Sequence, residues 1–477
     1  MTNLQVVTMS GGYTELDDQV LADFSTAFRG PVLTSDSPDY DEVRVVWNRM
    51  IDKRPALIVR CTGTADVVTA VNFARENNLL TSVRGGGHNV SGSSTNDGGM
   101  MIDLQLMNAA VVDQQARSVR VQGGATLGDL DHETRAFGRA TPGGVVSTTG
   151  VAGLTLGGGL SHLRRKYGLA LDNLLSVEIV TAGGQVLTAS AGENSDLFWG
   201  VRGGGGNFGV VTSFEFQLHA VGPLVTLCAP WYPVDNAKEL LLAWSAIMQE
   251  APQEFSCNAM FWTVPPIPDF PEEHHGKRFL AFAGVHCGSL EEGERITNPL
   301  RELGTPMVDL SGPAPLAFVN SAFDPFFPKG ERFAYFKSQY LNELDETVVD
   351  ALLPRAINPP DPSVLIVLWH YGGAMRHKSS TETAFMGREA PYLFSVDGIW
   401  DDASKSEEVV AYAREFLAEM KPYSPGGLYV NFAGFGEEGN ALVRSAYGEN
   451  YDRLVSLKDK YDPANLFRLN QNVKPTV

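Results

Sequence analysis

Long apolar runs and paired cysteines are both missing from this sequence. No segment approaches the roughly 18 apolar residues that span a bilayer, and residues 1–5 lack the basic start of a signal peptide. The four cysteines, Cys61, Cys228, Cys257 and Cys287, lie far apart and form no CxxC pair. These absences argue against a membrane protein, a disulfide framework and a zinc site. We therefore expect a cytoplasmic protein with buried free thiols and no metal.

Basic side chains are also in short supply. The chain has 37 Lys and Arg residues against 56 Asp and Glu residues, which gives a formal net charge of −19. This acidic balance argues against binding to nucleic acid or to an anionic membrane. We interpret the basic run at 164–166 as the solvated face of a helix. The expected partner is a small molecule.

The length and the glycine distribution indicate more than one domain. A single core stops growing near about 250–300 residues, so a chain of 477 residues predicts at least two cores. Residues 1–222 are rich in glycine and alternate short apolar runs with turn signals. Over 223–425 the pattern changes to two-period strands and amphipathic helices, which predicts a sheet backed by helices.

The glycine loop at 84–88, Arg-Gly-Gly-Gly-His, directly follows an apolar stretch that predicts a buried strand. Three glycines allow a sharp turn and bring several backbone N–H groups within reach of an anion. His88 would then lie beside the bound group. Taken alone, the loop favours a surface turn that carries an incidental histidine, and only the rest of the chain reverses this preference.

Two further glycine-rich segments, 141–159 and 203–209, lie in the same half of the chain. The second can be aligned with a dinucleotide fingerprint, but it follows a predicted helix and opens a predicted strand. This order is the reverse of a Rossmann unit, so we exclude a Rossmann domain. Three separate glycine segments indicate one shared ligand that bears phosphate.

Four motifs in order along the chain resemble those of one family. They are 84–88; the stretch 150–159 followed by 165–169 and 172–174; 197–199 with 202–209; and the tail 460–472. With this combination the chain resembles the FAD-linked oxidases that include berberine bridge enzyme and 6-hydroxynicotine oxidase, within the vanillyl-alcohol-oxidase (VAO) or PCMH-type flavoproteins. It is especially similar to the enterocin-pathway branch, with which it shares Thr149 and the sequence Tyr-Val-Asn-Phe at 429–432.

The resemblance implies an α+β fold with two parts. A two-subdomain FAD-binding domain would combine residues 1–222 with a returning segment, 426–477, and a substrate domain of antiparallel sheet backed by helices would occupy 223–425. FAD would be bonded to a ring nitrogen of His88, without a second bond because Val146 stands where bicovalent members have a cysteine. The implied cofactor-binding residues are Arg84, Gly85, Gly86, Gly87, His88, Gly92, Thr148, Thr149, Gly150, Gly153, Asn207, Gly209, Val211, Asn431, Asn470 and Asn472.

The catalytic base is harder to assign. Many members of the family use the second tyrosine of a Tyr-x-Asn-Tyr motif, where this chain has Phe432. Strand alternation would place Tyr429 and Asn431 on one face and Phe432 on the other. His370, which ends an apolar strand, titrates in the right range for a base, and Tyr371 and Tyr429 are the other candidates. A core histidine bonded to a backbone carbonyl is an equal alternative for His370.

The resulting hypothesis is an FAD-dependent oxidase that removes a hydride from a small alcohol, phenol, amine or secondary metabolite, with reoxidation by dioxygen to peroxide. Oxygen transfer to a polyketide-like substrate is the alternative within the same fold. A flavin-holding protein with an inactive site is a third hypothesis, which only the missing tyrosine supports. We expect a monomer or a homodimer.

Overall fold

A four-stranded sheet with three parallel strands forms the first part of the fold. The computed structural model describes residues 3–268, 270–436 and 439–476. In it β4, β6 and β5 pair in parallel, and β3 runs antiparallel at the edge. Helix α3 connects β4 to β5 and shares a core with the sheet, in which Leu57, Val59 and Ala70 are fully buried. The bounds are β3 Val32–Leu33, β4 Leu57–Arg60, α3 Thr64–Glu76, β5 Thr81–Arg84 and β6 Met100–Asp103.

A five-stranded antiparallel sheet completes the glycine-rich half. Its strand order is β11-β10-β12-β8-β7. Strands β10 and β11 pair as a hairpin around a turn in which Gly184 has a φ of +76°. The bounds are β7 Ala110–Asp113, β8 Ser118–Gln122, β10 Leu174–Thr181, β11 Val186–Ser190 and β12 Gly209–Gln217, with helices α4 Leu127–Arg135, α5 Val151–Gly157 and α7 Ser195–Val201 in this half.

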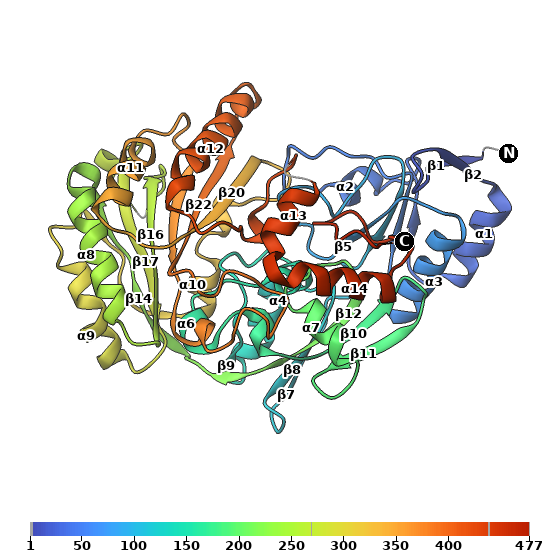
Figure 1. Ribbon diagram of the computed structural model, residues 1–477, viewed down its shortest axis with the longest axis horizontal. Coiled ribbons are helices and arrows are strands. Elements are labelled where there is room, and N and C mark those ends of the chain that lie inside the picture. Colours follow the sequence, from blue (N-terminus) through green and yellow to red (C-terminus); the bar gives the residue numbers. More distant parts are fainter. Residues whose placement is uncertain (1–2, 269, 437–438, 477) are drawn as a thin grey trace.

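A nine-stranded antiparallel sheet lies at the other end of the molecule, with helices on its outer side (Figure 1). Its main path is β18-β15-β17-β16-β21-β22-β20, and β14 and β19 pair off this path. This architecture confirms the predicted fold class, whereas the exact domain boundaries stay a prediction. The bounds are β14 Leu224–Cys228, β15 Pro230–Pro233, β16 Phe255–Thr263, β17 Arg278–His286, β18 Val308–Asp309, β19 Gly312–Pro315, β20 Phe333–Leu341, β21 Leu365–His370 and β22 Tyr392–Trp400, with helices α8 Ala237–Glu250, α9 Leu290–Arg301, α10 Leu316–Ser321, α11 Glu346–Ile357 and α12 Ser406–Met420.

Alternation along β21 separates the two faces of the large sheet. Ile366 and Leu368 belong to the core formed with the covering helices, where Trp244 of α8 is fully buried. Val367 and Trp369 belong to a different core on the opposite face. The sheet therefore presents one face to its helices and the other to the rest of the molecule.

The C-terminal segment returns to the glycine-rich half as α13 Asn440–Tyr447 and α14 Tyr451–Tyr461 (Figure 1). Lys458 of α14 is fully buried, and its ammonium donates to Asp462 Oδ2 at 2.7 Å, to the carbonyl of Asn207 at 2.8 Å and to that of Phe467 at 2.9 Å. One cation therefore ties the tail to the glycine segment 203–209.

The basic run at 164–166 is placed differently from our expectation. Helix α6, Arg164–Tyr167, lies against the large sheet, with Arg164 and Arg165 buried. Arg165 donates to the carbonyls of Phe255 and Ala251 at 2.6 and 3.0 Å, so the run holds the two halves together. The prediction of a solvated helix face was wrong because these side chains satisfy carbonyls at the start of β16, at the end of β21 and in the loop before β16.

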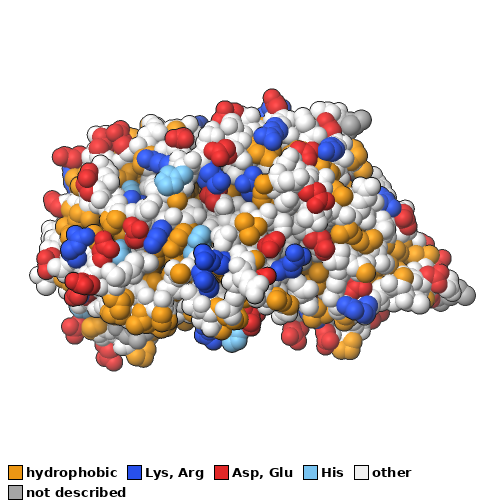
Figure 2. All heavy atoms as spheres, turned by 90° about the horizontal axis from the view of Figure 1, so that it is seen from below, with side chains coloured by type: hydrophobic (Ala, Val, Ile, Leu, Met, Phe, Trp, Pro, Cys, Tyr) orange, Lys and Arg blue, Asp and Glu red, His pale blue; other side chains and the backbone are white. Residues whose placement is uncertain are grey.

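The remaining elements lie at the periphery: β1 Leu4–Val7, β2 Tyr13–Leu16, α1 Asp18–Ala27, α2 Tyr40–Arg44, β9 Arg139–Ala140 and β13 His219–Ala220. Acidic and basic side chains are interspersed over the face in Figure 2. In the described part of the chain, no helix has the length and apolar character needed to cross a membrane.

We expect Lys458→Met to lower the free energy of unfolding by about 3 kcal/mol, because the Asp462 carboxylate then remains buried without its cation. Lys460→Met is the matched control, since its ammonium pairs with Asp196 at the exposed surface of the same helix. Lys460→Met should lower the free energy of unfolding by less than about 1 kcal/mol. Urea unfolding followed by tryptophan fluorescence measures both variants. Equal losses of stability in the two variants would contradict the conclusion that Lys458 ties the tail to the segment 203–209.

Candidate active site

A cavity of about 320 Å³ is lined by the glycine segments, the large sheet and the C-terminal tail. The first half contributes 85–90, 144–146, 149–150, 152–154 and 205–206 among others. The large sheet and its neighbours contribute mainly apolar and aromatic side chains. The lining residues from the second half include Asn258, Met260, Phe323, Phe327, Phe336, Leu365, Val367, Trp369, Asp397, Tyr429, Val430, Asn431, Phe432, Phe467, Leu469, Asn470 and Gln471.

The loop 84–88 packs directly on the start of α5. A Cβ at Gly86 would lie 2.5 Å from the Cα of Gly150, and a Cβ at Gly150 would lie 2.4 Å from the nitrogen of Gly86. Neither position accepts a side chain. Arg84, which we expected at the cofactor, instead donates from Nε to Asp103 Oδ1 at 3.0 Å and from Nη1 to the carbonyl of Val43. It anchors the loop and lies outside the lining.

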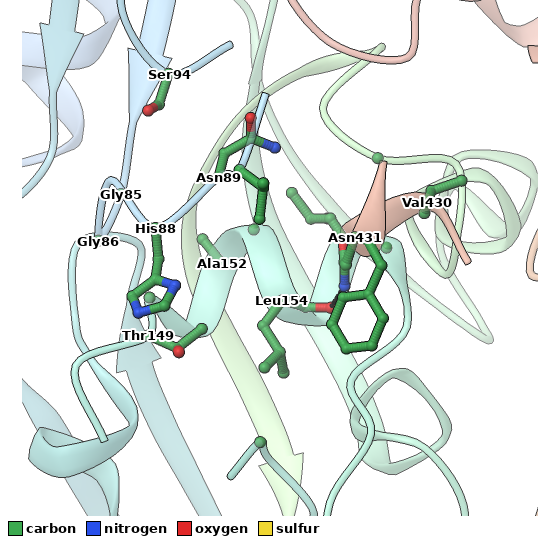
Figure 3. Close-up of a pocket in the computed structure, with 18 of the residues that line it drawn as sticks. Gly85, Gly86, His88, Asn89, Ser94, Thr149, Ala152, Leu154, Val430 and Asn431 are labelled. Carbon is green, nitrogen blue, oxygen red and sulfur yellow. Dashed lines mark hydrogen bonds between the residues drawn. The ribbon is translucent and has the colours of Figure 1, made fainter. Parts of the chain in front are cut away.

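His88 lies in the cavity with a free ring nitrogen. Its imidazole stacks on Trp47, with 4.4 Å between ring centroids and 13° between planes, and it points toward Thr149 in Figure 3. Burial lowers the pKa of His88 to about 4, so the ring is neutral at physiological pH. Nε2 has no hydrogen-bond partner among the described residues. A neutral imidazole with a free lone pair is a competent nucleophile.

The second glycine segment places Thr149, Gly150 and Gly153 in the lining, as predicted. Thr148 and Gly92 lie outside it. Thr148 is exposed at the turn before α5, whereas Thr149 is half-buried. Thr149 and Ala152 are visible beside the His88 ring in Figure 3.

The third glycine segment uses its asparagine to hold the tail. Gly209 and Val211 line the cavity, but Asn207 does not. Its amide donates to the carbonyls of Gly204 at 2.8 Å and Gln471 at 3.2 Å and accepts from the nitrogen of Val473 at 3.0 Å. These bonds show that Asn207 positions the loop, and its contact with the cofactor stays a prediction.

The tail contributes Asn470 to the cavity, whereas Asn472 lies outside the lining. Asn470 donates to the carbonyl of Gly206 at 3.1 Å, and its Oδ1 is buried without a partner among the described residues. Ser94 also lines the cavity, and its hydroxyl is likewise buried without a partner among the described residues.

These features fit FAD. Buried polar atoms without partners, at His88, Ser94 and Asn470, need a ligand to satisfy them. Glycines at 85–87 and 205–206 leave backbone groups open to a pyrophosphate. The aromatic and apolar surface of the large sheet suits a flat ring system and a substrate above it.

His370 lies on the opposite face of β21 from the cavity. Its ring packs against Trp244 and Tyr392, with centroid distances of 6.1 and 5.4 Å, on the side covered by helices. Burial and the nearby Arg165 and Arg164 lower the pKa of His370 to about 2. The structure therefore corrects our expectation that His370 reaches the cavity. It is a core histidine, as in the alternative, but its Nδ1 has no hydrogen-bond partner among the described residues.

The two tyrosine candidates, Tyr371 and Tyr429, are both buried, and the phenol of Tyr429 is also hydrogen-bonded. Tyr371 is buried and does not line the cavity, and burial raises its pKa well above the ordinary value. Tyr429 lines the cavity, where its oxygen accepts from the nitrogen of Gly159 and from Asn431 Nδ2, both at 2.9 Å. Burial raises the pKa of Tyr429 to about 12, so it stays protonated at neutral pH.

Residues 430–432 form a 3₁₀ turn, so our prediction of a strand here was wrong. With about three residues per turn, Tyr429 and Phe432 come to the same side, and both line the cavity. Their rings meet edge to face at 4.9 Å. Asn431 also lines the cavity and donates to the carbonyl of Leu154 at 3.0 Å.

Asp397 is the candidate base that the sequence analysis missed. It lies on β22 in register with Phe336 and Leu365, and no other carboxylate of the described residues lines the cavity. Burial raises the pKa of Asp397 to about 7, while a hydrogen bond from Ser395 acts in the opposite direction. Its Oδ1 has no partner in the described part of the chain. A carboxylate in this condition is suited to take a proton near neutral pH.

The sequence feature that could have pointed to Asp397 is the apolar strand around it. Asp397 is the single charged residue of β22, Tyr392–Trp400, whose other side chains are mostly apolar and all buried. A lone acid in such a strand needs either a partner or a function.

Comparison with known proteins agrees with this geometry. Residues 55–190 match the family model described as FAD binding domain, and residues 428–474 match the one described as berberine and berberine like. An FAD-linked oxidoreductase of Dictyostelium discoideum is 32% identical over 96% of this chain and 97% of its own length. The (R)-6-hydroxynicotine oxidase of Paenarthrobacter nicotinovorans is 31% identical, over 94% of this chain and 97% of its own.

The fold agrees as well. The crystal structure of 6-hydroxy-D-nicotine oxidase from Arthrobacter nicotinovorans superposes with a TM-score of 0.83 at 30% identity, covering 94% of this chain and 98% of that one. The glycine-rich half, the antiparallel sheet and the returning tail are therefore arranged as in a PCMH-type flavoprotein. The chain belongs to the FAD-linked oxidoreductase family of berberine bridge enzyme and 6-hydroxynicotine oxidase, and it is an FAD-dependent oxidoreductase.

Proposed function

We propose that this protein is an oxidase of small organic substrates in which FAD is bonded covalently to His88 and Asp397 is the base. The observation that carries the proposal is the buried, partnerless oxygen of Asp397 in the same cavity as the neutral imidazole of His88. The chemistry that FAD supplies when bound is hydride acceptance and reoxidation by dioxygen to hydrogen peroxide.

The side chains around Asp397 prepare it to accept a proton from an O–H or N–H group of the substrate. Trp369 donates from Nε1 to Ser395 Oγ at 3.3 Å, which leaves the Ser395 hydrogen directed to Asp397. Met260, Phe336 and Val367 exclude water around this chain of contacts. Loss of the substrate proton to Asp397 makes departure of the neighbouring hydride easier.

Backbone groups and side-chain amides would bind the cofactor on the other side of the cavity. The glycine loop at 85–87 and Ser94 would hold the pyrophosphate and ribose region, and Asn470 and Asn431 would approach the ring system. Tyr429 acts as a positioning residue here, since its phenol oxygen fixes Gly159 and Asn431.

A second candidate function, transfer of oxygen to the substrate, is favoured by one observation. The hydroxyl-bearing Thr149 lines the cavity beside His88, where it can hydrogen-bond an oxygen species (Figure 3). Turnover under ¹⁸O-labelled dioxygen separates the two functions. Label in peroxide alone supports the oxidase, and label in the organic product supports the oxygenase.

Wild-type protein is expected to keep one FAD of added mass after denaturation, and His88→Ala is expected to lose it, because only this imidazole offers a free nitrogen at the loop. Intact mass spectrometry and in-gel flavin fluorescence measure the linkage. His162→Asn, another buried cavity histidine, is the matched control and should retain the mass. Covalent flavin in His88→Ala would contradict the assignment.

Asp397→Asn should slow substrate-dependent bleaching of the flavin by about 10²- to 10⁴-fold, since an amide cannot accept the proton. The substrate is one found by peroxide release from a panel of phenols, alcohols and cyclic amines. In the wild type, the rate should rise with pH up to about 7, because the carboxylate loses its own proton over that range.

Ser395→Ala is the control for this pH dependence. It removes the hydrogen bond that lowers the pKa of Asp397, so the rate profile should move to higher pH without disappearing. Stopped-flow absorbance across pH measures all three proteins. A profile that is identical in the wild type and Asp397→Asn would rule Asp397 out as the base.

A further inference from the structure

One corner of the cavity, formed by Asn258 and His162 with Arg164 behind them, offers a hydrogen-bond donor that the proposed reaction does not use. Arg164 donates from Nη2 to Asn258 Oδ1 at 2.5 Å. A guanidinium has only donors, so the amide oxygen of Asn258 must face it. The amino group of Asn258 is then directed away from Arg164, and Asn258 lines the cavity.

The positive charge of Arg164 is not neutralised by a carboxylate. Its other hydrogen bonds go to the carbonyls of His370 at 3.1 Å, Ser161 at 3.0 Å and Cys257 at 3.4 Å, and no carboxylate of the described residues is among the groups that act on its charge. Burial lowers the pKa of Arg164 to about 10, which leaves it charged at neutral pH. The corner is therefore electropositive.

His162 adds to the same corner. It is buried and lines the cavity, and neither ring nitrogen has a partner among the residues that the structure describes. Burial, with Arg164 nearby, lowers the pKa of His162 to about 3, so the ring is neutral and has one N–H to donate. The buried ring of His162 thus lacks a partner that a ligand can supply, and the amino group of Asn258 beside it is free to donate to the same ligand.

The walls between this corner and Asp397 are apolar. They are formed by Met260, Leu365, Val367, Trp369, Phe336 and Phe432. A ligand with many hydroxyl groups would leave them without partners along these walls, which costs free energy at each one. The lining therefore favours a molecule whose polar groups are confined to its two ends.

The sheet register gives the distance between the two ends. Asn258 pairs with Trp369, and Trp369 pairs with Leu393, which is four residues from Asp397 along β22. This separation is about 13 Å along the strands and, over two strand spacings, about 10 Å across them. A substrate that reaches both ends extends over more than one ring.

We propose that Asn258 is a specificity-determining residue that binds a carbonyl oxygen on an extended, ring-bearing apolar substrate. Arg164 is the positioning residue that holds the Asn258 amide with its amino group toward the substrate. The group to be deprotonated lies at the Asp397 end, and this part of the inference rests on the proposed function. The binding preference itself is independent of turnover.

Two matched probes test the preference: 6-acetyl-2-naphthol, and 6-isopropenyl-2-naphthol, in which a methylene replaces the carbonyl oxygen. Neither carries a carbinol hydride, so both are dead-end ligands. Isothermal titration calorimetry on the holoenzyme should give a Kd about 5- to 10-fold lower for the ketone, the effect of one hydrogen bond. Equal Kd values, or no binding of either probe, would overturn the proposal.

Variants then locate the preference. Asn258→Asp keeps an acceptor for Arg164 but removes the donor, so it should abolish or reverse the ketone preference. Met260→Leu, two residues along the same strand and in the same wall, should preserve it. Retention of the full preference in Asn258→Asp would refute the role of Asn258.

Arg164 is tested against its neighbour. Arg164→Met frees the amide to rotate and should reduce the ketone preference. Arg165→Met should not, because among the described residues the guanidinium of Arg165 donates to backbone carbonyls and not to Asn258. If either variant fails to fold, Asn258→Asp still decides. Different results would contradict the proposed function: absence of covalent FAD, or an unchanged rate in Asp397→Asn. Neither result alters the ratio of the Kd values of the two probes.

Discussion

The backbone contact between Gly86 and Gly150 is the constraint on which the cavity depends. Because a Cβ at either position would lie within 2.5 Å of the other segment, the loop that carries His88 and the helix that begins after Gly150 meet without side chains between them. The same helix ends at Gly157, where a Cβ would lie 2.1 Å from Asn431 Oδ1. Two close approaches therefore fix α5 between the first glycine loop and the C-terminal segment.

The buried charges of the site are kept apart instead of being paired. Arg164 and Arg165 are satisfied by neutral oxygen atoms, and Asp397 has a serine hydroxyl but no cation. Pairing them would cancel both charges and remove their effect on a ligand. Separation along one sheet instead gives the cavity an electropositive end and a proton-accepting end, and the intervening residues need only be apolar.

Much of the fold and the cofactor region followed from sequence, because glycine segments and strand periodicity are local signals. Of the residues predicted to bind the cofactor, 85–88, Thr149, Gly150, Gly153, Gly209, Val211, Asn431 and Asn470 line the cavity. The errors came from information that is not local. His370 is one residue from Trp369, and one residue of alternation moves a side chain to the other face. Arg164, Arg165 and Asn207 bind backbone groups from distant segments, and Asp397 lacks a motif that would have drawn attention to it.

The dependence on the tail has a consequence for biosynthesis. Phe467, Leu469, Asn470 and Gln471 form part of the cavity wall, and Lys458 holds this segment against residues 203–209. While the ribosome is still making the second half, the nascent chain has its glycine loops but not the wall that closes over them. We therefore expect flavin capture to follow synthesis of the tail, and a chain that stops before residue 467 to lack the wall that retains the cofactor.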